Sequence, residues 1–246
     1  MWLNIETRQK ASFHFKVVIL LGIAGISFIR SDAPTSTIFA QDSQATSASN
    51  TAAVPTTVVE PGHVNVEFSR LYIFVDKSGA IGHQHAVEGK LQSGNVKLSG
   101  SMPGNLIFDM NSFDADTDAA RKYLGLEGST EDSTRKQVNA NMRGNTILDV
   151  KRYPQATFEN IRVQSKTTKS ARGFPEILLT GNFTLHGKTQ LIEVVADVEQ
   201  ANGWNHVRGS FQILQTNYGI KPFSKMLGAI GVKDALVIHG DLWIAP

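Results

Sequence analysis

Two histidines lie two residues apart in the stretch IGHQHAVEGKL at 81–91, and their type and spacing could support chemistry. Alternate side chains of a strand point to the same face, so His83 and His85 would lie side by side. Val87 and Leu91 fall on that face as well, which predicts that both imidazoles point inward. Such a pair could bind a metal ion or hydrogen-bond the polar group of a ligand.

A metal site would need further ligands, because zinc takes three or four converging donors. His186 and His239 could supply them, and the metal-binding alternative uses His83, His85 and His186. His186 also lies in a predicted tight turn, where it could bond a backbone group, and His239 could pack in the core. We therefore favour contact between the histidine pair and a ligand without metal, since ligand pockets are mostly apolar with a few polar groups.

Three acids, Asp114, Asp116 and Asp118, have the spacing that opens a calcium-binding loop. The rest of the segment does not match a calcium-binding loop. Ala119 occupies the position where the loop requires glycine, and Gly125 occupies the position of the closing glutamate. We interpret the three acids as a solvent-exposed face that caps a helix.

Composition and motifs argue for a binding protein without catalytic activity. The chain of 246 residues contains no cysteine, so it has no disulfide, thiolate metal site or cysteine nucleophile. Its sequence has no phosphate-binding glycine loop, dinucleotide fingerprint or nucleophile elbow. Of its 24 basic and 22 acidic residues, four basic and two acidic residues lie in the first 40. The remainder is balanced in charge, which gives no basic footprint for nucleic acid.

The N-terminal region predicts export. Basic residues precede an apolar run at 17–29, which is too short to span a bilayer and typical of a signal peptide over 1–40, cleaved after Ala40. An uncleaved anchor is the alternative. Residues 41–62 are small and polar and predict a flexible linker. One domain over 63–246 follows, and we expect it in a bacterial periplasm or secreted, where disulfides are permitted but not required.

Strand patterns dominate this domain. Eight or nine runs rich in β-branched and aromatic residues, separated by Gly, Asn and Asp, predict an antiparallel sandwich or barrel. They are 64–77, 82–91, 95–100, 104–113, 156–165, 176–185, 189–199, 205–215 and 234–245. The motif HGK at 186–188 predicts a tight hairpin. A helix is expected over 131–143, across one end of the sheet.

Several predicted strands are apolar on both faces. Leu71, Ile73 and Val75 lie on one side of the first strand, and Tyr72 and Phe74 lie on the other. A sheet with one solvated face should alternate cleanly, so either the outer face is covered or the interior holds a ligand. A closed barrel of about eight strands has room for one small apolar ligand. A filled-core sandwich that acts as an interaction module is the alternative.

Aromatic side chains on or beside the predicted strands are the candidate ligand contacts, together with the histidine pair. Core packing explains any single one of them, but their number favours an apolar lumen. The candidate ligand-binding residues are Tyr72, Phe74, His83, His85, Phe108, Phe158, Phe183, Phe211 and Phe223.

Motifs spread over 63–246 resemble the YceI-like family. They are YPQATF at 153–158, LTGNFTLHGKTQLIEV at 179–194, NYGIKPFS at 217–224 and VKDALVIHGDLWI at 232–244. The resemblance implies an exported, all-β protein with one short helical insertion, folded as an antiparallel lipocalin-like β-barrel that encloses an apolar cavity. It further implies a bound polyisoprenoid or a related lipid.

The resemblance thus implies a periplasmic carrier with no catalytic role and no obligatory cofactor. The ligand would be an isoprenoid, a quinone-like molecule or a fatty lipid. The His83 and His85 pair departs from the first hairpin that the family generally carries, and favours a lipid with a polar head. The resemblance also makes a homodimer a reasonable expectation.

Overall fold

The computed structural model describes residues 59–246. The predicted signal peptide over 1–40 and most of the predicted linker over 41–62 lie outside the described residues. Within the described part, no helix is both long and apolar enough to cross a membrane.

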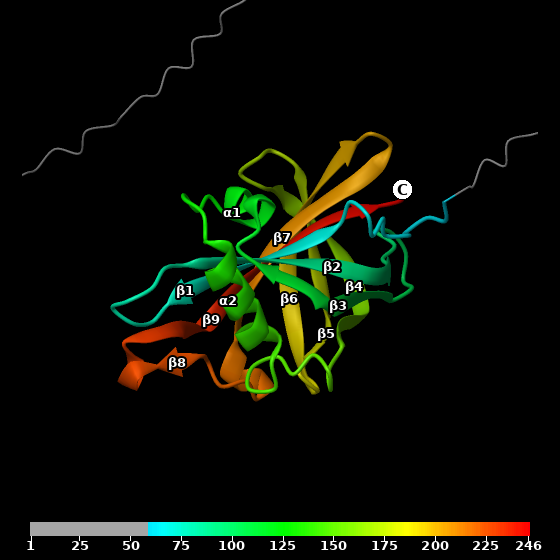
Figure 1. The fold of residues 1–246 in the computed structure, drawn as a ribbon. Coiled ribbons are helices and arrows are strands. Elements are labelled where there is room, and N and C mark those ends of the chain that lie inside the picture. The colour runs from blue at the N-terminus through cyan, green and yellow to red at the C-terminus, as the bar shows by residue number, and fades with distance from the viewer. Residues whose placement is uncertain (1–58) are drawn as a thin grey trace, which may run out of the picture. The chain divides into compact units, whose positions relative to one another are not determined.

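The fold is mostly β, with two short α-helices between the third and fourth strands (Figure 1). The strands are β1 (Arg70–Lys77), β2 (His85–Asn95), β3 (Gly104–Ala115), β4 (Gln155–Lys169), β5 (Pro175–Leu185), β6 (Lys188–Ala201), β7 (Trp204–Leu214), β8 (Ser224–Lys225) and β9 (Ile230–Ile244). The helices are α1 (Asp118–Tyr123) and α2 (Asp132–Arg143), and two 3-10 turns, η1 (Gln215–Tyr218) and η2 (Met226–Gly228), follow β7 and β8.

Eight of these strands close into an antiparallel barrel. Strands β1 to β7 pair in chain order, β7 pairs with β9, and β9 returns to pair with β1. The closing register runs from Arg70 opposite Asp241 to Val75 opposite Leu236. The short β8 adds only to β9. The predicted lipocalin-like barrel is confirmed, and the sandwich alternative is wrong because β1 and β9 leave no open edge between them.

The predicted hairpin at 186–188 is confirmed between β5 and β6. Both turn residues adopt left-handed backbone conformations, with φ of 51° at His186 and 71° at Gly187. A two-residue hairpin turn of this kind requires positive φ at both positions, and it matches the twist of the flanking strands. At Gly187 a Cβ atom would also lie 2.8 Å from the Tyr153 ring, so glycine serves packing as well as conformation.

Two predicted strand segments take other conformations. The first strand begins only at Arg70, because Asn65 turns the chain before it: its side-chain oxygen accepts hydrogen bonds from the amides of Glu67 and Phe68. The predicted strand at 95–100 does not form, and the chain bends away after β2. A local side chain that satisfies backbone amides competes with the sheet ladder, and alternation of residue types does not reveal it.

The two apolar faces of β1 have different partners. Leu71 and Ile73 are buried inside the barrel. On the outer face, the Tyr72 ring stacks on the Tyr123 ring of α1, with centroids 4.0 Å apart. Helix α1 therefore covers part of the outer face, which explains why this strand does not alternate between apolar and polar residues.

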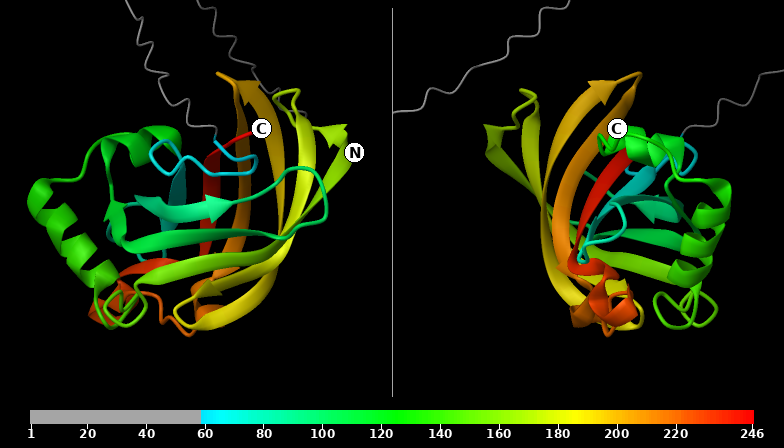
Figure 2. Two further views of the ribbon diagram at one scale, coloured as in Figure 1. Left: turned by 90° about the vertical axis from the view of Figure 1, so that its right-hand side faces the viewer. Right: turned by 60° about the vertical axis from the view of Figure 1, so that its left-hand side comes forward.

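The predicted helix over 131–143 is confirmed as α2. Asn139 holds it to β3 by accepting a hydrogen bond from the Ala115 amide at 2.8 Å, and Arg135 donates to the Ala115 carbonyl at 2.8 Å. Both helices lie on one side of the barrel, away from β5 and β6 (Figure 2). Val138 and Met142 of α2 face inward and line the barrel cavity.

Candidate ligand-binding site

An apolar cavity of about 180 Å³ lies inside the barrel. Inward side chains of the strands form its wall, and α2 together with the segment after it, through Met142, Ile147 and Leu148, forms its cover. An engineered cavity of about 150 Å³ is known to hold benzene, so this cavity accepts a small apolar group or part of a longer chain.

A second, smaller apolar hollow of about 50 Å³ lies beside the cavity inside the barrel. Leu71, Phe108 and Phe183 line both spaces and therefore form the wall between them. The rings of Phe108 and Phe183 meet edge to face, with centroids 6.5 Å apart.

Six of the nine candidate ligand-binding residues line these two spaces. Those at the larger cavity are His85, Phe108, Phe183 and Phe223. Phe158 and Phe211 line the smaller hollow.

The other three candidates lie elsewhere. Tyr72 and Phe74 occupy the outer face of β1, because Leu71, Ile73 and Val75 take the inner one. His83 precedes β2, and its side chain is 48% exposed, beside the cavity wall rather than in it. Aromatic character alone does not separate the two faces of a strand whose outer face is covered by a helix.

Three polar side chains interrupt the apolar wall: His85, Asn141 and Gln215. Gln215 donates a hydrogen bond to the Lys233 carbonyl at 2.8 Å, which ties η1 to the start of β9. His85 Nδ1 donates to Asp116 Oδ2 at 2.7 Å. His85 therefore places a hydrogen-bonded imidazole at the edge of a mostly apolar cavity.

Asp116 is the centre of the polar network behind His85. Its side chain is fully buried and accepts hydrogen bonds from His85, the Ala86 amide at 3.0 Å, Arg121 at 3.2 Å and Thr130 at 2.9 Å. The interpretation of Asp116 as part of a solvent-exposed acidic face is wrong, because the turn between β3 and α1 points it inward. Burial alone would raise the pKa of its carboxyl, but the hydrogen bonds from His85, Ala86 and Thr130 outweigh burial and hold that pKa well below its usual range.

The neighbouring acids have separate roles. Asp118 lies exposed in the first turn of α1, where a negative charge favours the helix, as the capping interpretation predicts. Asp114 pairs with Arg135 and accepts a hydrogen bond from Asn139, which fastens α2 to β3. The three acids therefore do not converge into a calcium site.

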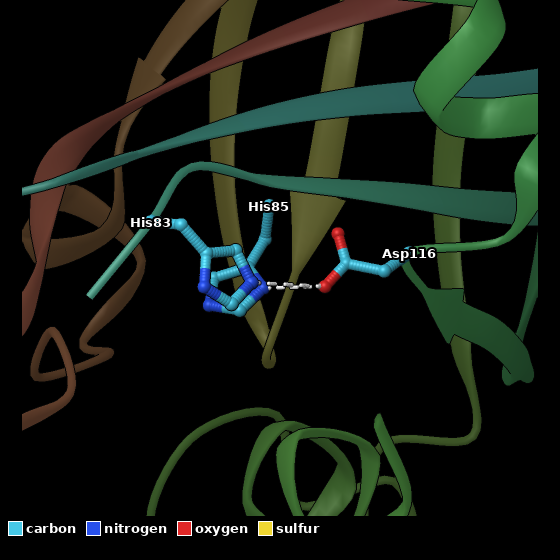
Figure 3. A group of neighbouring side chains, drawn as sticks. All are labelled: His83, His85 and Asp116. Carbon is cyan, nitrogen blue, oxygen red and sulfur yellow. Dashed lines mark hydrogen bonds and ion pairs between the residues drawn. The ribbon is translucent and has the colours of Figure 1, made fainter. Parts of the chain in front are cut away.

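His83, His85 and Asp116 do converge (Figure 3). One ligand atom from each residue lies within 4.8 Å of the others. The His83 and His85 rings lie 4.4 Å apart between centroids, and His83 Nε2 lies 3.6 Å from Asp116 Oδ2. His83 Nε2 also lies 3.2 Å from the Thr130 hydroxyl.

The other two candidate histidines do not join this group. His186 Nδ1 lies 3.3 Å from the Tyr218 carbonyl, so it bonds a backbone group at the hairpin, as predicted. His239 lies on the outer face, against the Tyr123 ring. Sequence reasoning missed Asp116 as the partner of the pair; a β2–β3 hairpin with Val87 opposite Ala115 would have indicated it.

Comparisons with known proteins found relatives in sequence and a matching family model. Two curated relatives, UPF0312 proteins of Shewanella sp. strains ANA-3 and MR-7, are each 28% identical over 117 residues, which is 45% of this chain and 58% of theirs. The match thus spans little more than half the length of those relatives.

Among solved structures, the chain matches BcnA from Burkholderia cenocepacia at 20% identity and a TM-score of 0.46, over 74% of this chain and 99% of that one. A polyisoprenoid binding domain from Saccharophagus degradans matches at 16% identity and a TM-score of 0.49, over 76% of this chain and 100% of that one. The model of the YceI-like domain family matches residues 58–242, which is most of the chain and nearly all of the barrel. The chain therefore belongs to the family of YceI-like domain proteins.

Proposed function

We propose that this protein is a non-catalytic carrier of an amphiphilic lipid, with the apolar chain held in the barrel cavity. The supporting observation is the cavity itself: a space of about 180 Å³ whose wall is apolar apart from three polar side chains. Burial of an apolar chain would drive binding, at about 0.8 kcal/mol per buried CH2 group. An isoprenoid, the ligand class of the Saccharophagus domain, is the first candidate to test.

The polar head of the lipid would lie near His85. Of the three polar side chains that line the cavity, His85 is the one that a strand supplies, and its hydrogen bond to Asp116 fixes its orientation. Quinone-like and fatty lipids carry oxygen atoms that an imidazole can hydrogen-bond, so they suit this end better than a bare hydrocarbon. A chain longer than the cavity would extend past Phe108 and Phe183 into the smaller hollow.

A cavity-filling variant tests this function. Met142→Trp places a large ring under the cover, and Met102→Trp makes the same change at a side chain that is 60% exposed and away from the cavity. Native mass spectrometry of each protein, purified from a bacterial host, measures the copurifying organic mass, and solvent extraction identifies it. We expect lipid on the wild type and on Met102→Trp, and much less on Met142→Trp.

Two results would contradict the proposal. Equal lipid occupancy in Met142→Trp would place the lipid outside the cavity. A wild-type chain that stays bare after incubation with an isoprenoid, a quinone and a fatty acid would exclude the lipid classes proposed. Thermal unfolding of both variants checks that the added ring leaves the barrel folded, because overpacking costs about 1–3 kcal/mol.

Export would place this carrier in the periplasm or outside the cell. N-terminal sequencing of the chain recovered from the periplasm of a bacterial host tests the expected cleavage after Ala40. Homodimerisation stays a prediction, and light scattering on the purified chain measures it.

A further inference from the structure

We propose that His83, His85 and Asp116 form a binding site for a divalent transition-metal ion at the edge of the cavity (Figure 3). The site shares His85 with the proposed lipid-binding cavity, whereas His83 and Asp116 do not line that cavity. The evidence for the site is the convergence of the three side chains, which does not rest on the proposed lipid carriage.

The donor set is one that zinc and related ions prefer. Two imidazole nitrogens and one carboxylate oxygen are common protein ligands for zinc, cobalt, nickel and iron. Donors around a tetrahedral ion with bonds of about 2.0–2.2 Å lie roughly 3.4 Å from one another. His83 Nε2 lies 3.6 Å from Asp116 Oδ2, close to that spacing. His85 Nδ1 is nearer, at 2.7 Å, because a proton now joins it to the same oxygen, and a metal ion would replace that proton.

The surroundings prepare the carboxylate as a ligand. Arg121 and the Ala86 amide bond Oδ1 of Asp116, which leaves Oδ2 directed at the two histidines. Partners that orient a ligand from behind are typical of metal centres. Thr130 hydroxyl lies within hydrogen-bond distance of both His83 Nε2 and Asp116 Oδ2, and so lies beside the position that an ion would take.

Access and coordination number also fit. His83 is about half exposed, so an ion can reach the site from solvent, while Asp116 closes the site from the protein side. Three protein ligands leave a coordination position for water or for another small ligand, as in open rather than purely structural zinc sites.

A second histidine–aspartate pair provides the matched control. His206 Nε2 lies 2.7 Å from Asp241 Oδ1, the same separation as in the proposed site. Within residues 59–246, however, His83, His85 and Asp116 are the one group of three metal-ligand residues that converges. His206→Ala therefore removes an equivalent histidine without touching the proposed site.

The test is titration of zinc chloride into the full chain, produced without an affinity tag and stripped of metal with a chelator. Isothermal calorimetry should give one zinc ion per chain. The His83→Ala variant should bind zinc at least about 10- to 100-fold more weakly, since loss of even an outer-shell partner typically costs that much. The His206→Ala variant should bind zinc with unchanged affinity. Cobalt substitution supplies a second readout, because a nitrogen- and oxygen-ligated cobalt ion absorbs visible light and the band should vanish in His83→Ala.

Equal zinc affinity in His83→Ala and the wild type would overturn the proposal, as would the absence of saturable zinc binding in a wild-type chain that unfolds cooperatively. His83 is half exposed, so its loss should leave the fold intact, and thermal unfolding checks this. Loss of lipid carriage leaves the zinc result unaffected, so failure of one proposal is distinguishable from failure of the other.

Discussion

The His85–Asp116 and His206–Asp241 pairs have the same separation, 2.7 Å between nitrogen and oxygen, and different surroundings. His206 stacks on Trp243 on the outer face of the barrel, with ring centroids 4.0 Å apart and planes 13° from parallel. His85 lies at the cavity, and His83 stands beside it. A histidine–aspartate pair is therefore not a site by itself; a second donor and an adjoining space make it a candidate.

The acids of the two pairs also differ in burial. The Asp116 side chain is fully buried and pairs with Arg121, itself almost buried, whereas the Asp241 side chain is 17% exposed. Removing one partner of a buried ion pair leaves the other charge without compensation, which costs far more than the loss of a surface contact. The two acids should therefore contribute unequally to stability.

The largest expected effect follows from this inequality. Asp116→Ala should lower the free energy of unfolding by about 3–5 kcal/mol, because Arg121 and the Ala86 amide lose their acceptor. Asp241→Ala should lower it by about 1 kcal/mol, the net value of one hydrogen bond. Urea unfolding followed by circular dichroism measures both. Equal losses would show that the two pairs are energetically alike.

A smaller effect should appear in ligand selection. His85→Ala should weaken binding of a fatty acid or quinone by about fivefold, since it removes one hydrogen bond to the head, worth about 1 kcal/mol. Binding of a bare hydrocarbon should not change. Displacement of a fluorescent lipid measures both ligands, with His206→Ala as the control. If His85→Ala kept the wild-type preference for fatty acid or quinone over hydrocarbon, the His85 imidazole would not contact the head group.

His83→Ala should separate binding from stability. Its side chain is 48% exposed, and the buried Asp116 keeps its shorter hydrogen bonds to other partners when His83 is removed, so the free energy of unfolding should change by less than about 0.5 kcal/mol. Urea unfolding beside the zinc titration checks this. A large loss of stability would mean that His83 supports the fold rather than a site.

The smallest effect concerns His239, a half-buried histidine packed on the Tyr123 ring rather than on a carboxylate. Burial lowers the pKa of His239 below its ordinary value of 6.5, so the unfolded chain binds a proton more readily than the folded one. Its contribution to stability is complete above pH 6.5 and is lost as the pH falls from 6.5 towards the lowered folded pKa. His239→Gln should reduce the fall in thermal unfolding temperature between pH 7 and pH 5. If the fall were the same in the variant and the wild type, other groups would be its cause.

Much of the fold was predictable because it depends on local patterns. β-Branched runs mark seven of the barrel strands nearly as they occur, and the HGK turn marks the β5–β6 hairpin. Start and stop residues mark α2 to within one residue at its beginning. The segment at 95–100 was predicted wrongly, since alternation also occurs in chain that bends.

The site was predictable only in part. The histidine pair was identified from its spacing, and its inward direction held for His85 because that residue begins a regular strand. His83 precedes the strand, so alternation does not govern its side chain. Asp116 was assigned to an exposed face, because its burial depends on how the β3–α1 turn returns beneath β2.

The sequence by itself determined most of the segments that form strands, the hairpin turn at 186–188 and the YceI-like family, because these depend on local backbone preferences and ordered motifs. Only the tertiary structure decided which face of β1 points into the barrel. It also decided that Asp116 lies beside His85 and His83, which precede it by 31 and 33 residues. The physical reason is barrel closure: the pairing of β1 with β9 orients every strand at once, and strand register, which local patterns do not specify, sets which distant side chains meet.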